Sequence, residues 1–80
     1  MKHRPVPRDY KFRGDRLRGI RQAAGYGQQE LAEKCGVGRT QIVNLEGCRH
    51  WPSVKMLYKL CDVLEVSADY LLGLSNYPRG

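Results

Sequence analysis

Three cysteines and two histidines are the side chains of the sequence best suited to bind zinc or to act as a nucleophile or base near neutral pH. They are Cys35, Cys48, Cys61, His3 and His50. Their spacing includes no Cys-x-x-Cys or His-x₃-His pair, so it does not indicate a zinc site. An odd number of cysteines does not indicate a disulfide framework either. We therefore predict no metal and no other cofactor.

Catalytic groups are not recognisable in the sequence either. It contains no Ser, His and Asp set, no glycine-rich phosphate loop and no carboxylate pair placed for a cleft. A chain of 80 residues forms one domain, which is too small for an enzyme-sized cleft between two layers. We predict that the protein is not an enzyme.

The basic side chains are concentrated at one end of the chain. The first 26 residues hold eight basic and two acidic side chains, whereas the rest holds six of each, and the net charge is +6. A basic segment beside a neutral body favours a polyanionic partner, most commonly nucleic acid. A basic tail that serves solubility is the alternative, and composition alone leaves both open.

Membrane association is not expected from the sequence. The longest uninterrupted apolar run is three residues. A membrane span needs roughly 20 apolar residues, and the apolar part of a signal peptide needs about 7–15. We expect a cytoplasmic protein.

The hydrophobic pattern predicts an all-α chain, because apolar residues recur at helical spacing and no strand pattern of useful length is present. Pro5 and Pro7 bar a helix from a basic arm at 1–10. The domain is expected at 11–74 and a tail at 75–80. Five short helices are expected: from about Lys11 to Ala24, at 28–35, at about 39–46, after the cap Ser53 and after the cap Ser67.

The helix after Ser53 has the clearest amphipathic pattern of the five. Its predicted apolar face consists of Val54, Leu57, Tyr58, Cys61 and Leu64. Cys35 and Cys61 lie on apolar helix faces and are expected to be small core residues. Cys48 lies in a loop and is expected to be exposed.

The spacing in residues 28–47 predicts a helix-turn-helix. Counted from Gln28 as position one, Ala32 stands at five, Gly36 at nine, Ile42 at fifteen and Leu45 at eighteen. Two helices that cross steeply need a small side chain where their backbones approach, which explains Ala32. The short turn between them needs a positive φ, which Gly36 adopts without steric cost. Ile42 and Leu45 then pack on the inner side.

With these residues placed, the chain resembles the Cro/C1-type, XRE-like helix-turn-helix family. The resemblance runs from the helix at 17–24 to about residue 74. The most specific motifs are Gln28-x-x-Leu31-Ala32, Gly36-Val37, Ile42-x-x-Leu45-Glu46, Pro52-Ser53 and Val66-Ser67-x-x-Tyr70-Leu71-Leu72. It implies a compact, five-helix, lambda-repressor-like domain that binds double-stranded DNA as a transcriptional repressor, usually as a homodimer on a two-fold operator.

The resemblance also implies roles for individual residues. The third helix would enter the major groove and read base edges, with Arg39, Thr40, Val43 and Asn44. Phosphates would be contacted by Gln28, Gln41, Arg49 and Arg21, and by Arg4 and Arg8 of the arm. A salt bridge between Arg21 and Glu46 would fix the third helix. The two-fold contact would lie at the end of the fifth helix, at Leu71, Leu74 and Tyr77.

Three positions depart from the family pattern. Gly38 stands where a Ser or Thr commonly caps the third helix. Gly47 and Cys48 stand where a polar residue and then a glycine are more usual. Trp51 replaces a small or polar residue, and it could pack on its own core, on DNA or on a second subunit.

A second function is compatible with the same fold. Antitoxins and other protein-interaction modules use it, and their partner is a protein. For the DNA-binding function the expected location is the nucleoid within the cytoplasm.

Overall fold

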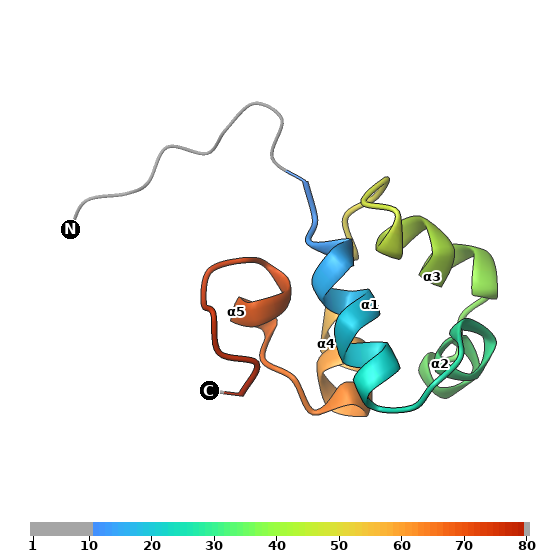
Figure 1. Ribbon diagram of the computed structural model, residues 1–80. Coiled ribbons are helices and arrows are strands. Elements are labelled where there is room, and N and C mark those ends of the chain that lie inside the picture. The colour runs from blue at the N-terminus through green and yellow to red at the C-terminus, as the bar shows by residue number, and fades with distance from the viewer. Residues whose placement is uncertain (1–10, 80) are drawn as a thin grey trace.

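The computed structural model describes residues 11–79, which form an all-helical domain in that range. The helices are α1 (Gly14–Ala23), α2 (Gln28–Cys35), α3 (Arg39–Glu46), α4 (Val54–Leu64) and α5 (Ala68–Leu71). α1 lies in the middle, between α3 and α5, and α4 passes behind it and contacts α2 and α5 (Figure 1). The predicted all-α fold is confirmed. The basic arm, with Arg4 and Arg8, lies outside the described residues.

Local signals place the ends of α2 and α3 where the sequence predicts them. The backbone N–H of Gly27 donates to the Glu30 carboxylate (3.3 Å) at the start of α2, where the helix dipole also favours an acid. α2 ends at Gly36, which has a φ of 70°. The next amide, of Val37, donates to the carbonyl of Ala32 (2.9 Å), as in a Schellman-type ending. The chain is thereby turned into α3.

The predicted start of α1 was too early. The helix begins at Gly14 rather than near Lys11. Phe12 is fully buried, and its carbonyl accepts a hydrogen bond from the Gly14 amide (2.8 Å). The backbone at Phe12 therefore forms a turn that places the Phe12 side chain in the core. The helix begins after this turn.

The predicted apolar face of α4 was right for Leu64, partly right for the half-buried Leu57 and Cys61, and wrong for Val54 and Tyr58. Met56, Leu60 and Leu64 are buried, whereas Val54 is 86% exposed and Tyr58 is 74% exposed. α4 carries apolar residues on two faces. The spacing of apolar residues in the sequence does not determine which of the two faces packs against the other helices. The core takes the Met56 face. We call the remaining apolar set, of which Val54 and Tyr58 are exposed and the other two residues half-buried, the outer face of α4. It consists of Val54, Leu57, Tyr58 and Cys61.

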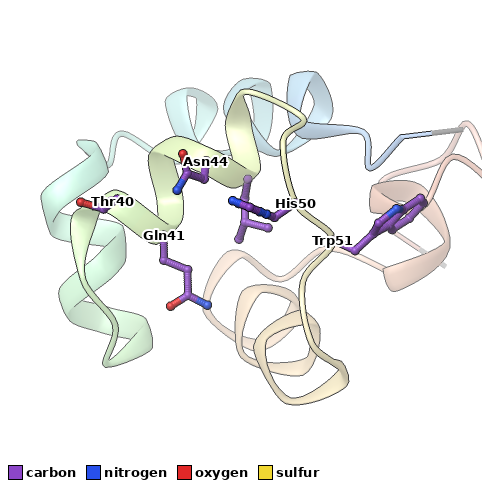
Figure 2. A pocket seen from close by; sticks show the side chains of 6 residues that line it. Thr40, Gln41, Asn44, His50 and Trp51 are labelled. Atoms are coloured by element: carbon purple, nitrogen blue, oxygen red, sulfur yellow. The ribbon is translucent and has the colours of Figure 1, made fainter. Parts of the chain in front are cut away.

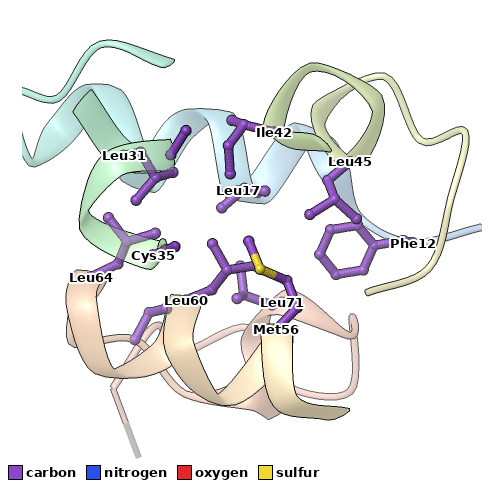
Figure 3. Packing of buried hydrophobic residues seen from close by; sticks show 12 residues of the cluster. Phe12, Leu17, Leu31, Cys35, Ile42, Leu45, Met56, Leu60, Leu64 and Leu71 are labelled. Atoms are coloured by element: carbon purple, nitrogen blue, oxygen red, sulfur yellow. The ribbon is translucent and has the colours of Figure 1, made fainter. Parts of the chain in front are cut away.

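The core is formed by side chains that converge from all five helices and from the turn before α1 (Figure 3). Its largest fully buried members are Phe12, Leu17, Leu31, Ile42, Leu45, Leu60 and Leu71. Leu71 is thus unavailable for the two-fold contact predicted there. Cys35 is buried and Cys61 half-buried, and burial raises the pKa of both thiols. Cys48, expected to be exposed, is half-buried.

Trp51 packs on its own domain along one edge. Its ring lies 6.1 Å from that of Phe12, between centroids, in an edge-on arrangement. The side chain remains 48% exposed. Trp51 therefore covers the turn before α1 and still presents part of its ring to the outside.

None of the helices described in residues 11–79 is long and apolar enough to cross a membrane.

The close approach of α1 to α3 gives a test of the packing. A Cβ on Gly14 would collide with the carbonyl oxygen of Leu45 and lie 2.7 Å from that of Glu46, whereas a Cβ on Gly19 would meet nothing within 4 Å. Gly14→Ala should therefore lower the free energy of unfolding by about 3 kcal/mol, since backbone must move. The matched control Gly19→Ala should raise it by about 0.5–1 kcal/mol through helix propensity. Urea unfolding measures both, and equal effects at the two positions would contradict the packing described.

Candidate nucleic-acid interface

α2 and α3 form a helix-turn-helix whose inner side is fully packed. Ala32, Ile42 and Leu45 are buried at the crossing, and the two helices are in contact with each other. The outer side of α3 begins with Arg39, which is exposed. The packing therefore fixes which side of α3 is presented outward.

A buried carboxylate ties α3 to both preceding helices. The Glu46 side chain is fully buried. Its two oxygens accept hydrogen bonds from Arg21 Nε (2.6 Å) and Arg21 Nη2 (3.0 Å). Gln28 Nε2 donates to the same carboxylate (3.2 Å), and Arg18 Nε lies 3.5 Å from it. The end of α3 is thereby held by α1 and by the first residue of α2.

All of the guanidinium nitrogens of Arg21 donate hydrogen bonds within the domain. Arg21 is buried, and its remaining terminal nitrogen, Nη1, donates to the carbonyl of Tyr26 (2.9 Å). The hydrogen bonds to Glu46 raise the pKa of the guanidinium, although burial opposes the charged form. The Arg21–Glu46 ion pair expected from the sequence is present, and Arg21 lies inside the domain rather than on its surface.

Gln28 links the buried carboxylate to the exposed start of α3. While its amide nitrogen donates to Glu46, its amide oxygen accepts from Arg39 Nη2 (3.3 Å). The chain of contacts Arg21–Glu46–Gln28–Arg39 thus joins the two ends of α3. Arg39 itself is exposed.

The loop after α3 folds back over the same side of the helix. The Arg49 amide donates to the carbonyl of Asn44 (3.0 Å), and Arg49 Nη1 lies within hydrogen-bond distance of Asn44 Oδ1 (3.4 Å). Arg49 is exposed and Asn44 half-buried. Asn44 is therefore oriented by the loop as well as by the helix.

A hollow of about 450 Å³ opens between α3 and this loop. Thr40, Gln41 and Asn44 project from α3 around it, and His50 and Trp51 come from the loop (Figure 2). Sequence reasoning did not assign His50 to the site. Its type was noted only for metal or base chemistry, and its spacing gave no signal for this site, because His50 reaches the hollow only through the fold of the loop.

We call the polar set on this side the reading surface. It consists of Gln28, Arg39, Thr40, Gln41, Asn44 and Arg49. Val43 is half-buried beside it on α3. The surface carries two guanidinium groups and otherwise neutral amides and a hydroxyl, a combination that suits phosphates and base edges. Among the described residues, no group of three or more potential ligands could hold a metal ion.

A family model described as helix-turn-helix matches residues 17–71. The HTH-type transcriptional regulator ImmR of Bacillus subtilis is 45% identical over 60 residues, which are 75% of this chain and 47% of that protein. SinR of the same species is 38% identical over 60 residues, 74% of this chain and 54% of that protein. The chain thus spans about half the length of the curated relatives it matches.

Solved structures of similar proteins include complexes with DNA. The P22 c2 repressor bound to a synthetic operator has a TM-score of 0.76 and 29% identity, covering 81% of this chain and 98% of that one. SinR in complex with DNA has a TM-score of 0.70 and 38% identity, covering 74% of this chain and 95% of that one.

The buried ion pair gives a second test. Glu46→Gln should lower the free energy of unfolding by about 3–5 kcal/mol, because it leaves the Arg21 charge buried without a counter-charge. Glu33→Gln, an exposed position on α2, is the matched control and should change it by less than about 0.5 kcal/mol. Denaturant unfolding followed by circular dichroism compares the two. A Glu46→Gln protein as stable as the control would show that the pair does not hold α3.

Proposed function

This chain belongs to the helix-turn-helix family, and on that premise we propose that it is a transcriptional regulator, a repressor that binds a specific double-stranded DNA sequence with two-fold symmetry. The observation that carries the proposal is the reading surface, whose helix is held at its end by the Glu46 contacts and is contacted at its start, at Arg39, by Gln28. A rigid helix presenting Arg39 and Asn44 has the preorganisation that base reading requires.

The exposed side of α3 supplies the chemistry for direct readout. The Arg39 guanidinium matches the O6 and N7 atoms of guanine, and the Asn44 amide matches N6 and N7 of adenine. The methyl groups of Thr40 and Val43 suit the methyl of thymine. Thr40 is exposed and Val43 half-buried, so Thr40 is the more accessible of the two.

Backbone contacts fix the register of such a helix in the groove. Gln28 stands at the N-terminus of α2, where free amides and the helix dipole attract a phosphate. Gln41 and Arg49 flank the bases on either side of Asn44, and Arg4 and Arg8 of the arm remain predicted contacts. We assign Arg21 to positioning, since its guanidinium is buried against Glu46.

Two further expectations follow from this proposal. The matching curated proteins are transcriptional regulators, and we propose that this chain likewise acts by binding and not as an enzyme. Its expected location is the cytoplasm, at the nucleoid, where its DNA lies.

A protein partner is the second candidate function. One similar structure is a complex of SinR with SinI, with a TM-score of 0.71, 38% identity, and coverage of 75% of this chain and 59% of that one. In an antitoxin or interaction module on the same fold, the protein partner would decide the biological role, and selection of a DNA sequence would not be required.

Selection from a random duplex pool at near-physiological salt separates these functions. We expect enrichment of an inverted repeat whose half-site centres lie about one helical turn apart, because two copies of α3 must enter successive major grooves. A pool that enriches no sequence would reject the repressor and favour the interaction module.

The roles of Arg39 and Asn44 can be tested on the selected site. Arg39→Ala and Asn44→Ala should each weaken binding by about 1–3 kcal/mol and relax the preference at one base pair. Arg79→Ala is the control for Arg39→Ala, because it removes the same charge from a different hollow, beside Ala23 and Leu64, and should leave the preference unchanged. Binding isotherms on the site and its single-base variants measure this. An unchanged preference in both α3 variants would exclude α3 as the reading helix.

A further inference from the structure

The outer face of α4 is an apolar surface that the domain leaves uncovered. Val54 and Tyr58 are 86% and 74% exposed. Together with Leu57, Cys61 and Ala68 at the start of α5, they line a groove of about 440 Å³. Exposed apolar side chains that are contiguous in this way mark an interaction surface rather than ordinary surface variation.

The charged residues beside this groove are arranged symmetrically. Lys55 and Asp62 are both exposed. They stand seven residues apart, which is two helical turns, so they lie on the same flank of α4. Tyr58 lies between them, next to their midpoint. One flank therefore carries a positive charge toward the start of the helix and a negative charge toward its end.

We infer that the outer face of α4 binds the outer face of α4 of a second copy of this chain, with the two helices antiparallel about a two-fold axis near Tyr58. A two-fold axis across the helices keeps the charged flanks on the same side and reverses their direction. Lys55 of each copy then faces Asp62 of the other, while the two sets of apolar side chains meet between them.

The charge pattern is what favours a second copy over a different protein. A two-fold interface must be complementary to itself, and opposite charges at equal distances from one axis meet that requirement. The inference rests on the proposed function in one respect, because an operator with two-fold symmetry is bound by a dimer with two-fold symmetry.

The small size of this surface limits the affinity between the two copies. One helix face with the start of α5 is small beside the roughly 1,200–2,000 Å² that stable complexes bury. The two copies therefore associate weakly in free solution. DNA that holds both copies on adjacent half-sites raises their effective concentration, and the same contact then contributes to cooperative binding.

The first experiment is sedimentation equilibrium of the full chain without DNA, over a wide range of concentrations. Tyr58→Gln should raise the dimer dissociation constant at least tenfold, because a buried aromatic side chain is lost on both sides of the axis. Tyr77→Gln tests the other two-fold contact, the one predicted from the sequence at the end of α5, since Tyr77 is 75% exposed and lies outside the groove; it should change the constant less than about twofold. A monomeric wild-type chain at all concentrations, or equal effects of the two variants, would overturn the inference.

Charge reversal tests the antiparallel register. Lys55→Asp alone and Asp62→Lys alone each place like charges opposite one another, and each should weaken self-association roughly threefold to tenfold. An equal mixture of the two variants should associate more strongly than either alone, because every facing pair is then of opposite sign. A mixture no stronger than the separate variants would contradict this register.

Binding to duplexes with one or two half-sites separates this inference from the proposed function. Tyr58→Gln should bind a single half-site like the wild type and lose most of the added affinity for the inverted repeat. If the wild type gains nothing from the second half-site, the α4 interface is wrong while DNA binding stands. If the chain associates through Tyr58 but selects no DNA, the proposed function fails and the interface stands.

Discussion

The arrangement of the first three helices depends on one buried carboxylate. Removing Glu46 from water costs several kcal/mol unless its charge and lone pairs are matched. The groups that match it come from different helices: Arg21 and Arg18 from α1 and Gln28 from the start of α2. The charge is therefore compensated only when α1, α2 and α3 are correctly placed together. Apolar packing at the neighbouring Leu45 keeps water away from Glu46. The carboxylate therefore has to be compensated by these side chains.

The same carboxylate connects stability to recognition. Glu46 ends α3 and Arg39 begins it, and Gln28 contacts both. The loop beyond Glu46 returns over α3 and brings Arg49 to Asn44. A base-reading helix gains selectivity from being held before DNA arrives, because less order has to be imposed on binding. Here the buried Glu46 contacts hold α3 from beneath and side-chain contacts within the reading surface add to them, while Arg39 and Thr40 remain exposed.

α4 shows how a small domain divides its apolar residues between folding and association. With apolar side chains on two faces, it fills the core with Met56, Leu60 and Leu64 and keeps Val54 and Tyr58 outside. A domain of this size has limited surface to bury, and a second copy offers more. Folding thus uses the Met56 face of this helix, and the inferred self-association would use its outer face.

The sequence by itself determined the features that depend on neighbouring residues. The bounds of α2 and α3 follow from Gly27, Gly36 and the apolar spacing between them, and the pairing of Arg21 with Glu46 was expected from the family resemblance. The tertiary structure alone decided the start of α1, the buried face of α4 and the place of His50 beside Asn44. Each of these depends on residues distant in the chain that compete for the same core or fold over the same surface. Periodicity shows that a helix has an apolar face, but where two faces qualify, only the packed neighbours select one.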